Sequence, residues 1–302
     1  MCLGFDTSNY TTSAAFYDGG TGRNESALLP VREGELGLRQ SEALFNHVKM
    51  LPDIVSRLGT GFTGLKAVGA SSKPRQAKGS YMPCFLAGVS VAKVLSEAFG
   101  VPYVEFSHQQ GHLAAAAWSA GCLDLLEEPF LAWHLSGGTT ELLYVSPKDG
   151  EPDCQTIGGT TDLSAGQLID RTGKLLGIPF PSGSGIDELA MKSGADNAYK
   201  IKTKDLFFSL SGMENMAADR YRAKSDPADI SRFVLSSIAD LVYRVNKEAL
   251  GRFGSLPILY SGGVSASNLL RAALKDGIFS KPEYACDNAI GIAILTNKAV
   301  LS

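Results

Sequence analysis

Cysteine is scarce in this sequence and is not arranged to form disulfides or to bind zinc. The five cysteines among 302 residues lie far apart, are odd in number, and include no Cys-x-x-Cys pair. This pattern argues against a disulfide framework and against a structural zinc knuckle. A reducing cytoplasm is therefore the predicted compartment.

Long apolar runs and an excess of positive charge are also missing. No uninterrupted apolar stretch approaches ~20 residues, and the N-terminal residues lack the basic and apolar regions of a signal peptide. We therefore expect neither a membrane span nor a secretory leader. Because 28 basic residues stand against 31 acidic ones, the net charge is −3, and RNA binding would require a local basic patch or a partner protein.

Three common enzyme motifs are absent as well. The sequence contains no GxxxxGK[ST], no GxGxxG after a strand and no GxSxG, which argues against P-loop, Rossmann and nucleophile-elbow active sites. Glycine, in contrast, is abundant, with 33 residues that cluster beside short apolar runs. In an α/β protein, such clusters mark the points where strands run into turns at a ligand crevice.

A strand–turn–strand pattern occurs twice. The first copy consists of strands Cys2–Asp6 and Thr11–Tyr17, and the second spans Phe130–Val145. When Asp6 is aligned with His134, the serines and threonines of the two turns coincide about 128 residues apart, which indicates a duplicated domain. Hairpins of this composition are also common, so a coincidence stays open.

Apolar residues at helical spacing predict helices around these hairpins. The helical segments are 41–57, 85–99, 108–119, 163–176, 230–253 and 289–300, with short strands at 101–106 and 257–260. The pattern breaks near Cys122–Pro129, so we expect one domain over 1–125 and a second over 126–289. The last helix, about 290–302, is expected to pack back on the first domain.

Two histidines and one aspartate form the sharpest local signal. His108 and His112 are four residues apart, so on a helix they share a face and can reach one metal ion. A third ligand is needed, and Asp287 stands just before the last helix. Each feature also has a plainer interpretation, because isolated histidines are common on surfaces and an aspartate in this position is typical of a helix N-cap.

Two glycine turns and an acidic residue suggest nucleotide contacts. Leu135–Thr140 and Ser261–Ser265 follow apolar strands, and backbone N–H groups in such turns can bind phosphate. Asp170 precedes a turn that contains Gly183 and could hold ribose hydroxyls, although a solvated aspartate paired with Arg171 or Lys174 is the commoner case.

Two short basic clusters are candidates for RNA contacts. They are Lys73–Lys78 and Arg220–Lys224, and the second has a tyrosine between its two arginines. Basic residues interleaved with an aromatic residue can contact phosphates and bases. A solvated charged face is the commoner meaning of such a cluster.

Ordered motifs along the whole chain resemble the TsaD family, also called Gcp or glycoprotease-like proteins, which are tRNA threonylcarbamoyladenosine transferases. The motifs are GFDTS at 4–8, QSEALFNHVKMLPDIV at 40–55, GVSVAKVLSEAFGVPYVEFSHQQGH at 88–112, and then LSGGTTEL, GQLIDRTGKLLGIPFPSGSG, FSLSGM, SGGVSASNLLR and CDNA. Several motifs in order are far more specific than any one of them.

The resemblance implies a fold, a reaction and a set of partners. The fold is the α/β fold of actin-like ATPases, sugar kinases and Hsp70, with two related domains around a nucleotide cleft. The reaction is transfer of threonylcarbamoyl from threonylcarbamoyl-AMP to adenosine 37 of tRNA, with one divalent ion, Fe²⁺ or Zn²⁺, and an ATP- or AMP-type nucleotide. The implied partners are tRNA and a TsaB-like paralogue, and a homodimer is a further expectation.

The resemblance also assigns site residues by matching position, although it identifies no catalytic side chain. The metal ligands are His108, His112 and Asp287. The substrate- or nucleotide-binding residues are Leu135, Ser136, Gly137, Gly138, Thr139, Asp170, Gly183, Gly262, Gly263 and Ser267.

Several positions depart from the family's pattern. Gln110 and Gln167 replace glutamates, Thr139 replaces a histidine, Ser267 replaces an asparagine, and Asp6 replaces a glutamate of the first strand. These changes indicate a diverged paralogue and support a second hypothesis, a non-catalytic scaffold that binds nucleotide or metal. A third hypothesis, a metallopeptidase of the M22 (O-sialoglycoprotein endopeptidase) type, is disfavoured because the histidine pair lacks the glutamate of HExxH enzymes.

Overall fold

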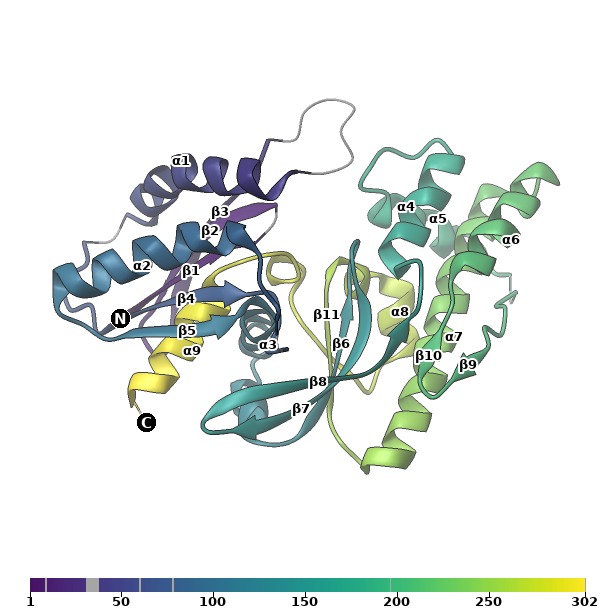
Figure 1. Cartoon of the computed structure of the whole chain (residues 1–302). Helices are drawn as coiled ribbons and strands as arrows, with labels where there is room; N and C mark the ends of the chain where they lie inside the picture. The colour runs from purple at the N-terminus through teal and green to yellow at the C-terminus, as the bar shows by residue number, and fades with distance from the viewer. Residues whose placement is uncertain (9, 31–37, 60, 78, 196, 302) are drawn as a thin grey trace. The chain divides into compact units, whose positions relative to one another are not determined.

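The computed structural model describes residues 1–8, 10–30, 38–59, 61–77, 79–195 and 197–301. The chain forms two compact units, each built around one β-sheet (Figure 1). The first unit consists of Met1–Glu128, Ser146–Cys154 and Cys286–Ser302, and the second of Pro129–Val145 and Gln155–Ala285. The mixed α/β fold predicted from the sequence is confirmed. No helix in the described part of the chain combines the length and apolar character that a bilayer-spanning segment requires.

The first unit has a five-stranded sheet in the order β3-β2-β1-β4-β5. The antiparallel part comprises β1, β2 and β3, whereas β4 and β5 run parallel to β1. The strands are β1 (Cys2–Thr7), β2 (Thr11–Tyr17), β3 (Gly22–Leu28), β4 (Ala67–Lys73) and β5 (Tyr103–Ser107). The helices are α1 (Gln40–Leu58), α2 (Leu86–Phe99), α3 (His108–Ser119) and α9 (Ile290–Leu301), with short 3₁₀ turns η1 (Pro83–Phe85) and η2 (Leu123–Glu127).

The second unit has a seven-stranded sheet in the order β12-β11-β6-β7-β8-β10-β9. Its strands are β6 (Phe130–Leu135), β7 (Thr140–Lys148), β8 (Glu151–Thr160), β9 (Thr203–Lys204), β10 (Phe207–Phe208), β11 (Ile258–Ser261) and β12 (Ile278–Phe279). Its helices are α4 (Ala165–Leu175), α5 (Gly183–Lys192), α6 (Ser211–Arg222), α7 (Pro227–Phe253) and α8 (Asn268–Ala273). The 3₁₀ turn η3 covers Gly263–Ala266, and η4 (Pro282–Tyr284) follows β12.

The two predicted hairpins pair in the same register. Asp6 lies opposite Ser13 in the first hairpin, and His134 lies opposite Glu141 in the second. In each sheet, two parallel strands lie on the side of the first hairpin strand that faces away from the hairpin. They are β4 and β5 beside β1, and β11 and β12 beside β6. The two units therefore repeat one strand order, as the duplicated sequence pattern predicts.

The predicted helices form with small shifts at their ends. The predicted span 108–119 is the span of α3, and α1 continues through Pro52. Helix α2 begins at Leu86 because Pro83–Phe85 forms a 3₁₀ turn, and α4 begins at Ala165 because Ser164 caps it. Helices α5, α6 and α8 and the β9–β10 hairpin were not predicted from the sequence, because these elements are short or have little apolar periodicity.

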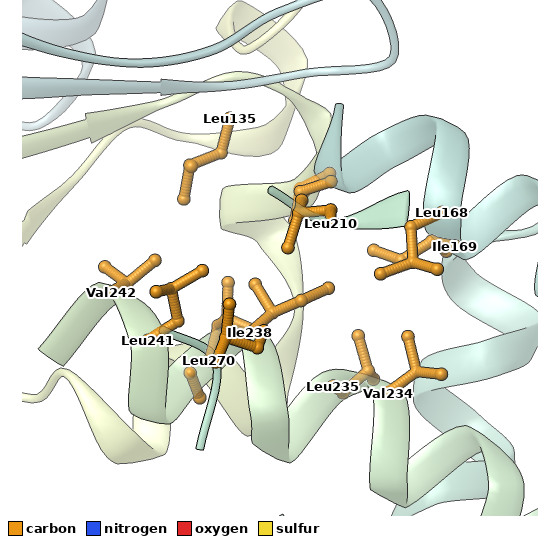
Figure 2. Packing of buried hydrophobic residues seen from close by; sticks show 14 of the residues in the cluster. Leu135, Leu168, Ile169, Leu210, Val234, Leu235, Ile238, Leu241, Val242 and Leu270 are labelled. Carbon is orange, nitrogen blue, oxygen red and sulfur yellow. The ribbon is translucent and has the colours of Figure 1, made fainter. Parts of the chain in front are cut away.

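Helix α7 lies in the hydrophobic core of the second unit. Figure 2 shows Leu235, Ile238 and Leu241 of α7 among Leu168 of α4 and Leu210. All five side chains are at most 1% exposed. Full burial of a leucine or isoleucine side chain contributes about 1.5–3 kcal/mol, so this layer fixes α4 and α7 under the sheet.

Helix α9 of the first unit packs closely against α3. A Cβ atom on Gly111 of α3 would lie 2.9 Å from Cδ1 of Ile292, and one on Gly291 would overlap the carbonyl of Gly111. Glycine is therefore required on both helices for this approach. The close packing brings the segment before α9, which contains Asp287, next to the first turns of α3 (Figure 1).

Candidate functional site

His108, His112 and Asp287 come together in the first unit. The Nε2 atoms of the two histidines lie 2.9 Å apart, and Oδ1 of Asp287 lies 3.5 Å from Nε2 of His108 and 3.2 Å from Nε2 of His112. One potential ligand atom from each residue lies within 4.8 Å of those of the other two. The structure therefore brings together the three residues that the sequence suggested.

The start of α3 fixes the two histidines. Ser107 ends β5 and caps the helix by accepting a hydrogen bond from the backbone N–H of Gln110, whose side chain accepts one from Ser107 N at 2.7 Å. This capping box sets the first helical turn. His108 is thus the first residue of the helix and His112 follows one turn later on the same face.

Asp6, at the end of β1, holds the ring of His108 from the other side. Its Oδ2 lies 2.7 Å from Nδ1 of His108, and its Oδ1 accepts a hydrogen bond from Ser8 N at 3.0 Å. The Asp6 carboxyl is 1% exposed. With Nδ1 engaged, Nε2 of His108 is the nitrogen that faces His112 and Asp287. No role for Asp6 at this site was predicted from the sequence, where it stood out only in the hairpin alignment and as a departure from the family.

Asp287 does not serve as the N-cap of α9. Its Oδ2 accepts hydrogen bonds from Ser8 Oγ at 2.9 Å and from Thr11 Oγ1 at 3.3 Å, whereas its Oδ1 faces the histidines. The Ala289 N–H at the start of α9 instead donates to Oδ1 of Asn24 at 2.8 Å. The side chain is thus oriented toward the histidines by two hydroxyl donors.

The histidines and carboxylates of the cluster stabilise one another's charged forms. Burial disfavours the ionised Asp287, but hydrogen bonds from His108 and His112 hold its pKa well below the usual value. Burial also disfavours protonated His108, but the carboxylates of Asp6 and Asp287 raise its pKa well above the usual value. Negative charge converging on two imidazole nitrogens is an environment that favours a cation. Two imidazoles and a carboxylate are ligands for zinc and for non-haem iron, so the residues present fit such an ion.

The predicted phosphate turn, Leu135–Thr139, connects β6 and β7 in the second unit. Ser136 N donates to Thr139 O at 2.8 Å, and Thr139 N donates to Ser136 Oγ at 3.0 Å, which closes the turn. A Cβ atom on Gly137 or Gly138 would meet nothing within 4 Å. The glycine backbone is therefore open to an approaching ligand, as a phosphate-binding turn requires.

The N-terminus of α4 supports this turn. Ser164 donates a hydrogen bond to Gly137 O at 2.7 Å and accepts one from Gln167 N at 3.1 Å. The next two backbone N–H groups are also engaged, because Ala165 N donates to Thr140 Oγ1 at 2.8 Å and Gly166 N to Ser136 O at 3.2 Å. The helix end therefore positions the turn and does not itself offer these groups to a ligand.

Asp170 and Gly183 meet where α4 faces the start of α5. Asp170 Oδ1 accepts a hydrogen bond from Ser182 N at 2.9 Å, next to Gly183, which begins α5. The expected alternative partner of Asp170, Arg171, instead pairs with Glu214 at 2.7 Å. A Cβ on Gly183 would meet nothing within 4 Å, so its backbone is open to a ligand.

Ser267 and the Gly262–Gly263 turn complete a ring of contacts in the second unit. Ser267 caps α8 and donates a hydrogen bond to Asp187 of α5, which also accepts from Asn268 N at 3.0 Å. Gly262, with φ +87°, lies against the Leu135 backbone, and Gly263 begins η3. Asp187 was not predicted from the sequence, and its contacts join α5 to the segment between η3 and α8.

Two of the departures from the family complete helix caps. Gln110 and Gln167 occupy equivalent places in the capping boxes of α3 and α4. Gln110 Nε2 also donates to Glu151 Oε2 at 3.1 Å and to Pro152 O at 3.2 Å. A glutamate at position 110 could not donate these two bonds, so Gln110 and Glu151 fit one another.

The second predicted basic cluster is engaged within its own unit. The guanidinium of Arg220 lies 3.8 Å from the ring centre of Phe233, and Arg222 forms an ion pair with Asp219. In the first cluster, Lys78 lies outside the described residues. The structure therefore does not single out either cluster as an RNA surface.

The chain is similar to known transferases of tRNA. Residues 42–294 match the profile of a family described as tRNA N6-adenosine threonylcarbamoyltransferase, TsaD. A tRNA N6-adenosine threonylcarbamoyltransferase from Bacillus licheniformis is 28% identical over 297 residues, which cover 93% of this chain and 84% of the relative.

Solved structures with a similar fold have much lower identity. Component A of (R)-2-hydroxyglutaryl-CoA dehydratase from Acidaminococcus fermentans has a TM-score of 0.61 at 16% identity, over 100% of this chain and 99% of that one. HypF from T. kodakarensis has a TM-score of 0.63 at 12% identity, over 99% of this chain and 47% of that one. A ROK family glucokinase from Streptomyces griseus has a TM-score of 0.53 at 12% identity, over 98% and 99% of the two chains. These similarities show the fold of actin-like ATPases and sugar kinases, as expected from the sequence.

Proposed function

Because the chain belongs to the TsaD family of tRNA threonylcarbamoyltransferases, we propose that it transfers threonylcarbamoyl from threonylcarbamoyl-AMP to adenosine 37 of tRNA. In this reaction the N6 amine of the adenosine attacks the carbonyl carbon of the donor. A new carbon–nitrogen bond forms, the bond from that carbon to the AMP phosphate oxygen breaks, and AMP leaves as the amine loses a proton.

One divalent cation is held by His108, His112 and Asp287 in this proposal, and Fe²⁺ and Zn²⁺ both suit the ligands. When bound, such a cation supplies a Lewis acid for donor carbonyl or phosphate oxygens. Asp6 orients the ring of His108, and Ser8 and Thr11 orient the carboxylate of Asp287. The convergence of these three ligands in a member of this family is the observation that carries the proposal.

The adenylate part of the donor is assigned to the second unit. The open backbone of Gly137 and Gly138 would accept its phosphate, and the ring of contacts through Asp170, Gly183 and Ser267 would hold the ribose and base. These residues position the donor, and positioning supplies much of the rate enhancement in such a transfer.

Metal analysis of matched histidine variants tests the cation site. Wild-type protein is expected to carry about one Fe or Zn per chain, His112→Ala is expected to lose it, and His134→Ala, outside the cluster, is expected to keep it. Equal metal content in wild type and His112→Ala would refute the ligand assignment. AMP titration of the same proteins checks that the second unit stays intact.

A second candidate function is a scaffold that binds nucleotide or metal without turnover. The observation that favours it is the presence of Thr139 and Ser267 where the family has histidine and asparagine. Complementation of a transferase-deficient strain separates the two functions, because the scaffold would bind AMP but fail to restore modified tRNA. A TsaB-like partner and a homodimer are further proposals, which co-purification and sedimentation would test.

A further inference from the structure

Three exposed lysines alternate with inward-facing residues along one edge of the second unit. Lys200, Lys202 and Lys204 are exposed, whereas Ile201 between them is 4% exposed and Thr203 is half-buried. This alternation places the three ammonium groups on the same outer side of the segment. The last of them belongs to β9, the final strand in the sheet order (Figure 1).

The backbone that presents these lysines is fixed at several points. Two residues of α7 hold the segment. Ser237 Oγ accepts a hydrogen bond from Tyr199 N at 2.8 Å, and the Arg244 guanidinium donates one to Ile201 O at 2.8 Å. The turn from β9 to β10 has positive φ at Asp205 and at Leu206, 51° and 69°, the geometry of a tight hairpin turn. Because Leu206 is only 1% exposed, the turn is anchored in the core and the lysines project from a rigid support.

Aromatic side chains stand beside the lysines. In the β9–β10 pairing Phe207 lies directly opposite Lys204, so both side chains are on one face of the hairpin. Phe207 is 39% exposed, while its neighbour Phe208 is 3% exposed, and Tyr199 at the other end of the segment is 42% exposed. An exposed ring next to an ammonium group can stack on a base while the ammonium contacts a phosphate.

Nearby carboxylates do not neutralise the lysines. Asp205 and Glu248 both pair with Arg252, and Asp240 pairs with Arg244. Within the described part of the chain, the three lysines have no carboxylate partner at ion-pair distance. Their charge is thus concentrated on a chain whose net charge is −3, so a polyanion would be attracted to this edge and not to the surface as a whole.

We propose that four residues form an RNA-docking strip for the substrate tRNA: Lys200, Lys202, Lys204 and Phe207. The lysines contact phosphates of the tRNA, and the phenylalanine stacks on an unpaired base. The inference rests on the proposed function, because it concerns the tRNA of that reaction. Lysines on an edge strand can instead serve to prevent edge-to-edge association of sheets. The two roles differ in what their removal changes.

Equilibrium binding of an unmodified tRNA transcript to the full-length protein, without donor, tests the strip. The triple variant Lys200→Gln, Lys202→Gln, Lys204→Gln is compared with Lys66→Gln, Lys148→Gln, Lys275→Gln, which removes the same charge from exposed lysines outside the strip and outside both basic clusters. The strip variant is expected to bind at least about 10-fold more weakly at 0.1 M salt, and the slope of log affinity against log salt is expected to fall by about 2–3. The control triple is expected to change affinity less than about two-fold.

The remaining outcomes decide the matter. Phe207→Ala is expected to weaken binding with no change in the salt slope, because stacking releases no counterions. The strip would be overturned if both lysine triples weakened tRNA binding equally. It would also be overturned if the strip variant self-associated while its monomeric fraction bound tRNA as wild type does, because the lysines would then serve to prevent association of sheet edges. If tRNA binds through the strip but no threonylcarbamoyl is transferred, the proposed function fails and the strip stands. If the strip variant transfers with an unchanged KM for tRNA, the strip fails and the proposed function stands.

Discussion

Asp6 Oδ2 lies 2.7 Å from Nδ1 of His108, across 102 residues of sequence. The contact leaves Nε2 of His108 pointing toward His112 and Asp287, at 2.9 Å and 3.5 Å. A carboxylate bonded to the far nitrogen of a metal-binding histidine fixes the ring orientation and increases its basicity. Asp6 thus determines which nitrogen of His108 is offered to a cation.

The first prediction concerns this carboxylate. Asp6→Asn keeps the size of the side chain but removes its negative charge, so the affinity of the protein for Zn²⁺ is expected to fall about 10–100-fold. Competition with a chromogenic chelator measures the affinity directly. Asp18→Asn, at an exposed turn of the same unit, is the matched control and is expected to bind Zn²⁺ as wild type does. An unchanged affinity in Asp6→Asn would show that the ring of His108 is held without it.

Local features of the site could be predicted from the sequence. The i, i+4 spacing of His108 and His112 fixes their common face once the segment is helical, and α3 spans the predicted residues. The glycine turns could be located because each follows a short apolar strand, β6 or β11. Such signals depend on neighbours in the chain, which a sequence displays directly.

Contacts between distant segments could not be predicted in the same way. Asp6 reaches His108 only because β1 and β5 end at the same edge of one sheet, and Asp187 reaches Ser267 only because α5 packs beside α8. Neither aspartate carries a local motif. Asp287 could be named as a candidate third ligand from its place before the last helix, but the same place favoured a helix cap, and only the resemblance to a family matched it to a metal ligand. In the structure the Ala289 N–H at the start of α9 donates to Asn24 instead.

The second prediction concerns the pair of Gln110 and Glu151. Gln110→Glu keeps the acceptor of the α3 capping box but replaces the amide donor with a carboxylate facing Glu151 and Pro152 O. We expect a loss of about 1–3 kcal/mol in unfolding free energy from the unpaired acceptors, with the added like-charge repulsion. Urea unfolding measures it.

A double-mutant cycle identifies the cause of that loss. Glu151→Gln restores a donor opposite position 110, so the double variant is expected to be more stable than the sum of the two single changes allows. Strictly additive losses would mean that Gln110 and Glu151 do not interact.

The third prediction concerns the serine that supports the phosphate turn. Ser164→Ala removes the cap of α4 and the hydrogen bond to Gly137 O. The cap alone contributes about 0.5–2 kcal/mol, and the loosened turn is expected to weaken AMP binding as measured by calorimetry. Asp226→Ala removes the cap of α7, where the Asp226 side chain accepts a hydrogen bond from Ala228 N at 2.7 Å, and is the control. If both variants lost similar stability and bound AMP with equal affinity, Ser164 would have no specific role in holding the turn for the ligand.

The last prediction concerns pH. His47 of α1 is buried, its Nδ1 lies 2.8 Å from Thr12 Oγ1, and burial lowers its pKa below the usual value. The unfolded chain therefore takes up a proton near pH 6.5 while the folded chain resists it. It follows that the contribution of His47 to stability is present above about pH 6.5 and is lost as the pH falls, by at most about 1.4 kcal/mol per pH unit.

Urea unfolding of wild type and His47→Gln between pH 5 and 8, with a chelator present, isolates this contribution. Both proteins contain His108, whose raised pKa has the opposite effect on stability, so that effect cancels in the difference. The wild type is expected to lose stability more steeply than His47→Gln as the pH is lowered. Parallel curves would mean that His47 titrates in the folded protein as it does in the unfolded chain, and that its burial between α1 and β2 does not disfavour the charged ring.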